Sequence, residues 1–158
     1  MEDKGELPMA LRAAYLALHR RSEARFAKCG VTADQFVLLA TLARGDALTQ
    51  RELARRMSSD PSTVRAMLVL LQKRGLVCRG AHPTDSRART VALTVAGKRK
   101  FQQVFATGKS IRDQMIEPLQ PGEGEILVRL LNQVAESLNS EFASAARSVS
   151  DDSQEDES

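Results

Sequence analysis

The sequence contains few of the residues that form reactive or cross-linked sites. Only two of its 158 residues are cysteine and two are histidine. Cys29 and Cys78 form no CxxC pair and have no adjacent histidine, which argues against a zinc site and a disulfide framework. We expect both thiols to be buried and inert rather than redox sensors. His19 and His82 accompany no GxSxG, HExxH or phosphate-loop motif, so we predict no enzyme activity, no metal and no cofactor.

Long apolar runs are also missing. No stretch reaches the roughly 18 consecutive apolar residues of a membrane span. The segment Met1–Gly5 is charged and lacks the apolar core of a signal peptide. We therefore predict a cytoplasmic protein without a membrane association. With 42% hydrophobic and 27% charged residues, the chain has the composition of one ordinary globular domain, and not of a fibrous or wholly disordered chain.

Charge is unevenly distributed along the chain. Residues 51–100 contain twelve basic and three acidic residues, a balance that favours a polyanion as partner. A solvated positive surface is the alternative that charge alone leaves open. The last eight residues hold five acids and no base, and we expect the segment 147–158 to be an acidic disordered tail.

Helix signals dominate the first half of the sequence. Apolar residues recur at helical spacing over 7–29, before Gly30. Thr32 with Gln35, and Thr49 with Glu52, have the spacing of capping boxes, which predicts a second helix to about residue 43 and a short third helix to about residue 57. Asp60 followed by Pro61 predicts a fourth helix, which ends before residue 75. The third and fourth helices are separated as in a helix-turn-helix.

The second half changes from strands back to helices. Residues 76–79 and 89–93 are predicted strands of a hairpin, joined by the loop 80–88. Thr94 can cap a long fifth helix that ends near Pro118, and Pro121 can open a sixth helix to about residue 145. The fold class is therefore mainly α with a small β-hairpin. The apolar stripes of the long helices can pack within the chain or face a second subunit, and the pattern does not decide between them.

The fourth helix has two different faces. Its predicted buried stripe is Val64, Met67, Leu68 and Leu71, and the opposite face carries Ser62, Ala66, Val69 and Lys73. Such an exposed face fits the DNA major groove: Ser62 and Thr63 can bond phosphate or a base, Arg65 can bind guanine, and Ala66 or Val69 can contact a thymine methyl group. The alternative is that the hydroxyl residues only begin the helix and that Arg65 is a solvated charge.

The hairpin loop offers a second possible contact. Arg87 at its tip can reach into a narrow minor groove, and Asp85 can hold the guanidinium in place. An ordinary surface ion pair is the alternative.

The segment 51–98 combines several specific motifs: Leu53-Ala54, the helix start 60–64 (DPSTV), the segment 74–77 (RGLV), the run 85–94 (DSRARTVALT) and Ala96-Gly97. With these motifs the segment resembles the MarR family of winged-helix transcription regulators. The aspartate-x-arginine pattern leading into Leu-Thr is its specific part. With the order of helices and hairpin, the similarity covers nearly the whole chain except the acidic tail.

The resemblance implies a winged helix-turn-helix at 32–94, flanked by long dimerisation helices at 1–31 and 95–146. It implies a homodimer that binds double-stranded DNA with an inverted repeat as a transcriptional regulator, most often a repressor. Family roles pass to the matching positions: recognition-helix contacts from Ser62, Thr63 and Arg65, and the wing arginine Arg87 with its positioner Asp85. We also expect Lys73 and Arg89 to be among the residues that bind DNA. Many members have a basic residue at the position of Ala66 and a polar pair at Val69-Leu70, so base preference does not carry over.

Similar proteins release DNA when a small aromatic acid binds between the dimer helices and the DNA-binding lobe. Tyr15 and His19, one turn apart on the first helix, lie near the implied position of that pocket. An interface tyrosine and a solvated histidine are the alternative. Cys29 lies at the end of the first helix, unlike the early cysteine of oxidant-sensing members. A winged helix that binds an acidic protein partner is the competing function.

Overall fold

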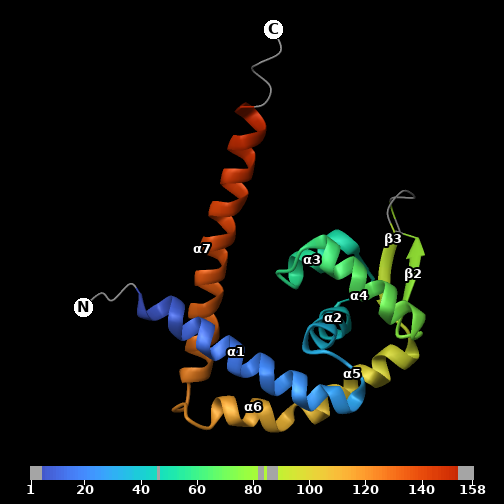
Figure 1. Cartoon of the computed structure of the whole chain (residues 1–158), viewed down its shortest axis with the longest axis horizontal. Coiled ribbons are helices and arrows are strands. Elements are labelled where there is room, and N and C mark those ends of the chain that lie inside the picture. The colour runs from blue at the N-terminus through green and yellow to red at the C-terminus, as the bar shows by residue number, and fades with distance from the viewer. Residues whose placement is uncertain (1–4, 46, 82–83, 85–88, 153–158) are drawn as a thin grey trace. The chain divides into compact units, whose positions relative to one another are not determined.

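A computed structural model of the chain describes residues 5–45, 47–81, 84 and 89–152, with side chains described up to residue 140. Its elements in chain order are α1 (Glu6–Phe26), the 3-10 helix η1 (Ala27–Cys29), α2 (Ala33–Arg44), β1 (Leu48–Thr49), α3 (Gln50–Arg56), α4 (Pro61–Lys73), β2 (Val77–Ala81), β3 (Arg89–Leu93), α5 (Val95–Thr107), α6 (Lys109–Ile116) and α7 (Glu123–Asp152) (Figure 1). The chain divides into two compact units, 1–113 and 114–158, and the division falls within α6. The predicted class, mainly helical with a small sheet, is confirmed.

The helices α2, α3 and α4 begin where their capping residues predict. Thr32 forms a complete capping box with Gln35 at the start of α2. Thr49 accepts a hydrogen bond from the backbone N–H of Glu52 at the start of α3, but the Glu52 carboxylate binds arginines instead of closing a second box. Asp60 caps α4 with Pro61 in the first helical position. These side chains satisfy amide groups that lack partners within the helix.

Three helix ends have the same hydrogen-bond pattern. After α1–η1, α3 and α4, the backbone reverses through a residue with positive φ: Gly30 at 71°, Ser58 at 51° and Gly75 at 71°. In each case the residue itself and its successor donate back to carbonyl groups of the last turn, as in the Schellman motif. Ser58 is the one non-glycine residue with positive φ in the described part of the chain.

The sheet has three antiparallel strands in the order β1-β3-β2. The predicted hairpin is confirmed, with Val77 opposite Leu93 and Ala81 opposite Arg89, although β2 starts one residue later than expected and extends to Ala81. The sequence pattern does not predict the strand β1, in which Leu48 pairs with Val91. A two-residue strand is too short to show an alternating pattern, so only its partner strand reveals it.

The core lies where α2, α3 and α4 pack against the sheet and α5. Its fully buried side chains are Leu38, Leu39, Leu53, Val64, Leu68, Leu71, Val91 and Val104. Beside them, the rings of Phe26, Phe36 and Phe101 follow one another at centroid distances of 4.9 and 6.0 Å. These rings join α1, α2 and α5 within the first unit.

The predicted long fifth helix is two helices, α5 and α6, which meet at Gly108. A Cβ atom on Gly108 would lie 3.3 Å from the Phe26 ring and 3.2 Å from Nη1 of Arg112. Arg112 also donates a hydrogen bond to the carbonyl of Phe105 and lies 3.7 Å above its ring. The break therefore lies where a ring from a distant helix packs, and no local stop signal other than glycine marks it.

In the second unit, α7 begins two residues after Pro121, directly after Gly122 with φ at 86°. The side chains of Ile126, Leu127, Val128, Leu130, Leu131 and Leu138 remain 39–63% exposed. The helix extends to Asp152 and therefore includes residues 147–152 of the segment that we expected to be disordered; residues 153–158 lie outside the described part.

No single described helix is long and apolar enough to cross a membrane; α1–η1 and α2, bent by 80°, meet that test only as a pair.

Candidate nucleic-acid interface

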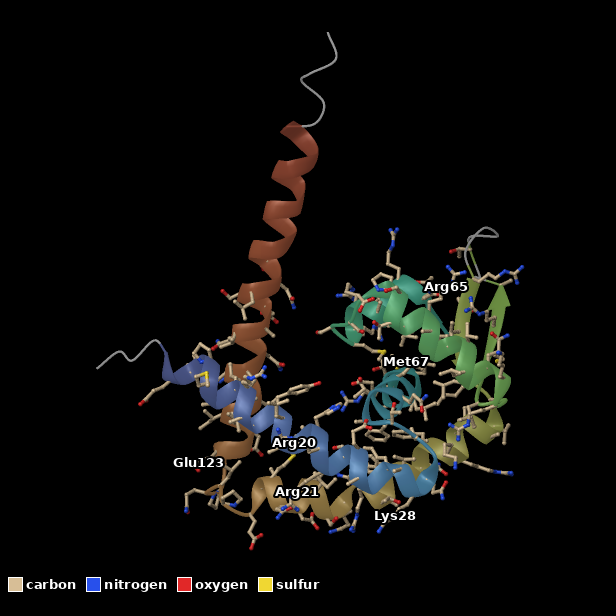
Figure 2. All side chains as sticks on the ribbon, viewed as in Figure 1. Arg20, Arg21, Lys28, Arg65, Met67 and Glu123 are labelled. Carbon is tan, nitrogen blue, oxygen red and sulfur yellow. The ribbon has the colours of Figure 1, made fainter. Side chains whose placement is uncertain are left out.

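The fourth helix has the two faces that its sequence predicts. Val64, Leu68 and Leu71 are fully buried, whereas Ser62, Thr63, Arg65, Ala66, Val69, Leu70 and Lys73 are exposed. Figure 2 shows Arg65 on the outer side of α4 and Met67 on the side toward α2. A helix that is held on one side and open on the other can enter a groove of the duplex without disturbing the core.

The start of α4 is organised around the carboxylate of Asp60. Its Oδ1 accepts hydrogen bonds from the Ser62 hydroxyl and from the Thr63 backbone N–H at 2.8 Å. Its Oδ2 accepts from the Thr63 hydroxyl at 2.6 Å. These donors stabilise the ionised form and hold the pKa of Asp60 well below its usual range, first through the Ser62 hydroxyl and then through Thr63. Both predicted contact hydroxyls are thus already hydrogen-bonded.

On α3, Glu52 forms ion pairs with two arginines. Glu52 accepts from Arg55 at 2.6 Å and 3.0 Å and from Nε of Arg56 at 2.8 Å. The hydrogen bond from Arg55, followed by that from Arg56, lowers the pKa of Glu52 to about 2. Spacings of three and four residues bring these side chains to one helix face. The ion pairs with Glu52 thus orient two guanidinium groups on the first helix of the helix-turn-helix.

The wing brings further basic residues beside the fourth helix. Arg79 on β2 donates through Nε to the Gln72 side chain on α4 at 3.3 Å. Arg89 is exposed at the start of β3 and pairs with Ala81 at the outer end of the hairpin. Asp85 and Arg87, the predicted wing contacts, lie outside the described residues, as does His82.

The other end of α4 is attached to the turn after η1. Arg74, the C-cap residue of α4, donates through Nη1 to the Gly30 carbonyl at 2.7 Å. Lys100 on α5 donates to the neighbouring Cys29 carbonyl at 3.1 Å. Neither contact is predictable from a local sequence pattern, because the partners are 44 and 71 residues apart. Helix ends present unpaired carbonyl groups, which cations satisfy well.

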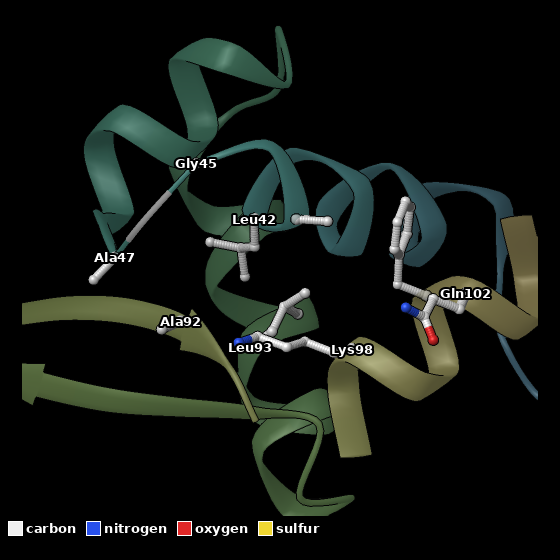
Figure 3. A pocket seen from close by; sticks show the side chains of 9 residues that line it. Leu42, Gly45, Ala47, Ala92, Leu93, Lys98 and Gln102 are labelled. Carbon is white, nitrogen blue, oxygen red and sulfur yellow. The ribbon is translucent and has the colours of Figure 1, made fainter. Parts of the chain in front are cut away.

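Tyr15 and His19 lie side by side on α1, with ring centroids 5.7 Å apart. Tyr15 is 58% exposed. Neither residue lines the two cavities described in the first unit. One, of about 510 Å³, is bordered by α2, β3 and α5, and Figure 3 shows Lys98 extending toward Leu93 there. The other, of about 530 Å³, is lined by α2 and Arg56 of α3.

The two thiols differ in their surroundings. Cys29 is half-buried, with Sγ 3.6 Å from the Thr107 hydroxyl. Cys78 is exposed on β2, so the expectation of a buried thiol is wrong there. Its strand has only one buried residue, Val77, because the outer face of the hairpin is solvated. Among the residues that the structure describes, no three histidine, cysteine or acidic side chains are grouped as a metal site.

Comparison with known proteins identifies relatives of this arrangement. Residues 30–88 match the model of the MarR family. The HTH-type transcriptional repressor MdtR of Bacillus subtilis (strain 168) is 31% identical over 106 residues, which cover 67% of this chain and 68% of that protein. The structure of the transcriptional repressor CouR bound to a 23-mer DNA duplex matches with a TM-score of 0.72 and 26% identity, covering 85% of this chain and 99% of CouR. The apo form of MarR from E. coli matches with a TM-score of 0.69 and 26% identity, covering 81% and 96%.

Proposed function

This chain belongs to the MarR family of winged-helix transcription regulators, and from that premise we propose that it binds an inverted-repeat operator as a homodimer and represses transcription. DNA binding is the function that the family carries, and relatives such as CouR are DNA-bound repressors. Such relatives are transcription regulators and not enzymes, and we propose no catalytic activity for this chain. A regulator of this kind works on DNA in the cytoplasm.

The observation that carries the proposal is the exposed face of α4. Arg65 is open to solvent between exposed small and polar residues, while the opposite face is fixed in the core. Because the major groove admits one α-helix, this face can reach base edges. Lys73 and Arg89 lie on the same lobe and can neutralise phosphates, and we keep Arg87 and Asp85 as the proposed wing contact.

A homodimer is supported by the exposed apolar side chains of α7. Leu127, Leu130 and Leu131 are 39–45% exposed on neighbouring turns of that helix. Leaving a continuous apolar stripe in water is unfavourable, and a second copy of the chain can cover it. Two paired recognition helices then require half-sites about one helical turn apart.

The proposed effector is a small aromatic acid, with Tyr15 and His19 as its contacts. The adjacent rings present an aromatic surface to which such a molecule can stack, and a ring N–H of His19 can donate a hydrogen bond to its carboxylate. A benzoate series added to the protein–DNA complex tests this: release of DNA should disappear in Tyr15→Ala. Equal release from wild type and variant would remove both residues from the proposal.

The decisive experiment measures binding to the upstream region of the chain's own gene, with and without competitor DNA, at several salt concentrations. We expect a protected inverted repeat and an affinity that falls steeply with salt, because each neutralised phosphate releases counterions. Equal binding to all duplexes, or a monomer in solution, would contradict the proposal. Binding to an acidic protein in place of DNA would favour the competing function.

A further inference from the structure

We propose that Asp60 sets the direction of the hydrogen bonds made by Ser62 and Thr63, so that the start of α4 selects bases with an exocyclic amino group, adenine or cytosine, on the contacted strand. The inference rests on the proposed function and specifies the chemistry that its recognition helix reads. It makes Asp60 a positioning residue and the two hydroxyls the groups that touch the base.

Each of the two hydroxyl protons is already engaged in a hydrogen bond. Ser62 donates to Oδ1 and Thr63 donates to Oδ2 of one carboxylate, which also accepts the Thr63 backbone N–H. A hydroxyl has one proton and two lone pairs. With the proton directed inward to Asp60, only lone pairs remain for a ligand, and both hydroxyls act outward as acceptors.

Acceptors distinguish the two kinds of base edge in the major groove. Adenine N6 and cytosine N4 are donors, whereas guanine O6 and N7 and thymine O4 are acceptors. Phosphate oxygens are also acceptors and carry charge, so the Asp60 carboxylate repels them from the helix start. The hydroxyls therefore suit an amino group and do not suit phosphate, guanine or thymine.

The next turn of the helix is consistent with this reading. Ala66 lies four residues after Ser62 on the same exposed face and offers only a methyl group. Arg65 is the cation of this face nearest the helix start and remains the donor for a guanine. The hydroxyls of Ser62 and Thr63 accept at the start of α4, and Arg65 donates slightly further along. The helix would therefore prefer an amino group at one base pair and guanine at a neighbouring base pair.

The test is selection from a randomised duplex library by the full-length chain and its variants, followed by affinity measurements on single-base substitutions. Wild type should prefer adenine or cytosine over guanine or thymine at one position of each half-site by roughly 3- to 10-fold, as expected of one neutral hydrogen bond. Ser62→Ala and Thr63→Val should reduce the preference at that position and leave the other positions unchanged.

Asp60→Asn is the sharper variant because asparagine is an equally good helix N-cap, so that the fold is retained. Its amide provides one oxygen instead of two, which frees a hydroxyl proton for an outside acceptor. We expect guanine and thymine to become tolerated at the same position. Asp113→Asn is the matched control: it removes the same charge from an exposed carboxylate paired with Lys109, away from α4, and should leave the preference unchanged.

The outcomes separate the inference from its premise. If wild type enriches no sequence, the proposed function and the inference both fail. If wild type enriches an inverted repeat but Asp60→Asn, Ser62→Ala and Thr63→Val select the same bases as wild type, only the inference fails. A wild-type preference for guanine or thymine at the position sensitive to Ser62 and Thr63 would also overturn it.

Discussion

Gly97, in the first turn of α5, lies against the backbone carbonyl of Leu76 so closely that a Cβ atom on Gly97 would be 2.0 Å from the carbonyl oxygen. The same junction holds two hydrogen bonds, from the Thr94 backbone N–H to Leu76 and from the Thr94 hydroxyl to the Gly75 carbonyl. The start of α5 is thereby attached to the residues that end α4. Thr94 joins the two by capping one helix and bonding the end of the other.

Replacing Gly97 by alanine should destabilise the first unit. The clash is with backbone, so the helix start or the strand must move, and overpacking of this kind typically lowers the free energy of unfolding by about 1–3 kcal/mol. The better helix propensity of alanine offsets part of this loss. The measurement is thermal unfolding followed by circular dichroism. Gly124→Ala is the control, because its nearest contact is Ile116 Cδ1 at 3.4 Å, and it should not lower Tm.

Ser58→Gly should stabilise the helix-turn-helix. The left-handed conformation is unfavourable for an L-residue, and glycine removes that strain while adding freedom to the unfolded chain, so we expect a gain of up to about 1 kcal/mol. Gly75→Ala is the reciprocal variant: no atom lies within 4 Å of its added Cβ, so the loss that we expect reflects the backbone alone. Urea unfolding compares the two, and changes of the same sign would refute the shared explanation.

Acid should weaken the fold partly through Glu52. Its pKa of about 2 in the folded chain is below the ordinary value of 4.5. The stabilising effect is therefore complete above about pH 4.5 and is lost as the pH falls toward 2. Glu52→Gln should lower Tm at pH 6 and change it little at pH 2.

The control for this experiment is Glu125→Gln, which removes an equal charge from a side chain without an ion-pair partner among the described residues. Thermal unfolding of the three proteins between pH 6 and pH 2 measures the difference. An equal decrease of Tm in wild type and Glu52→Gln across this range would mean that the arginine pairing contributes nothing to stability.

Arg65 and Lys73 should affect DNA binding in different ways. Arg65→Ala should weaken binding to the preferred duplex by about 1–3 kcal/mol and relax selectivity at one base position. Lys73→Ala should weaken binding to all duplexes alike and reduce the salt slope by about 1. Fluorescence anisotropy at several salt concentrations distinguishes them. A uniform loss with Arg65→Ala would assign that side chain to phosphate instead of a base.

Much of the recognition helix was predictable because its signals are local. Asp60 and Pro61 mark its first turn, and the spacing of Val64, Leu68 and Leu71 identifies its buried face. The same reasoning predicted the hydroxyls as open contacts, although Asp60 already binds both. A capping residue and its partners lie within three positions of each other, so the hydrogen bonds from the two hydroxyls to Asp60 could have been predicted from the sequence. The capping pattern alone gave Asp60 only backbone N–H groups as partners.

The sequence by itself determined the order of the helices, their capped starts and the basic segment with its wing pattern, since those features depend on residues a few positions apart. Only the tertiary structure decided that Leu48 forms an edge strand, that Gly108 divides a helix and that Arg74 binds the Gly30 carbonyl. Leu48 pairs with Val91, Gly108 lies beside the Phe26 ring and Arg74 binds Gly30, and each of these neighbours is more than forty residues away along the chain. A local pattern predicts which face of an element is apolar, but it does not specify which distant residue packs against that face in the folded chain.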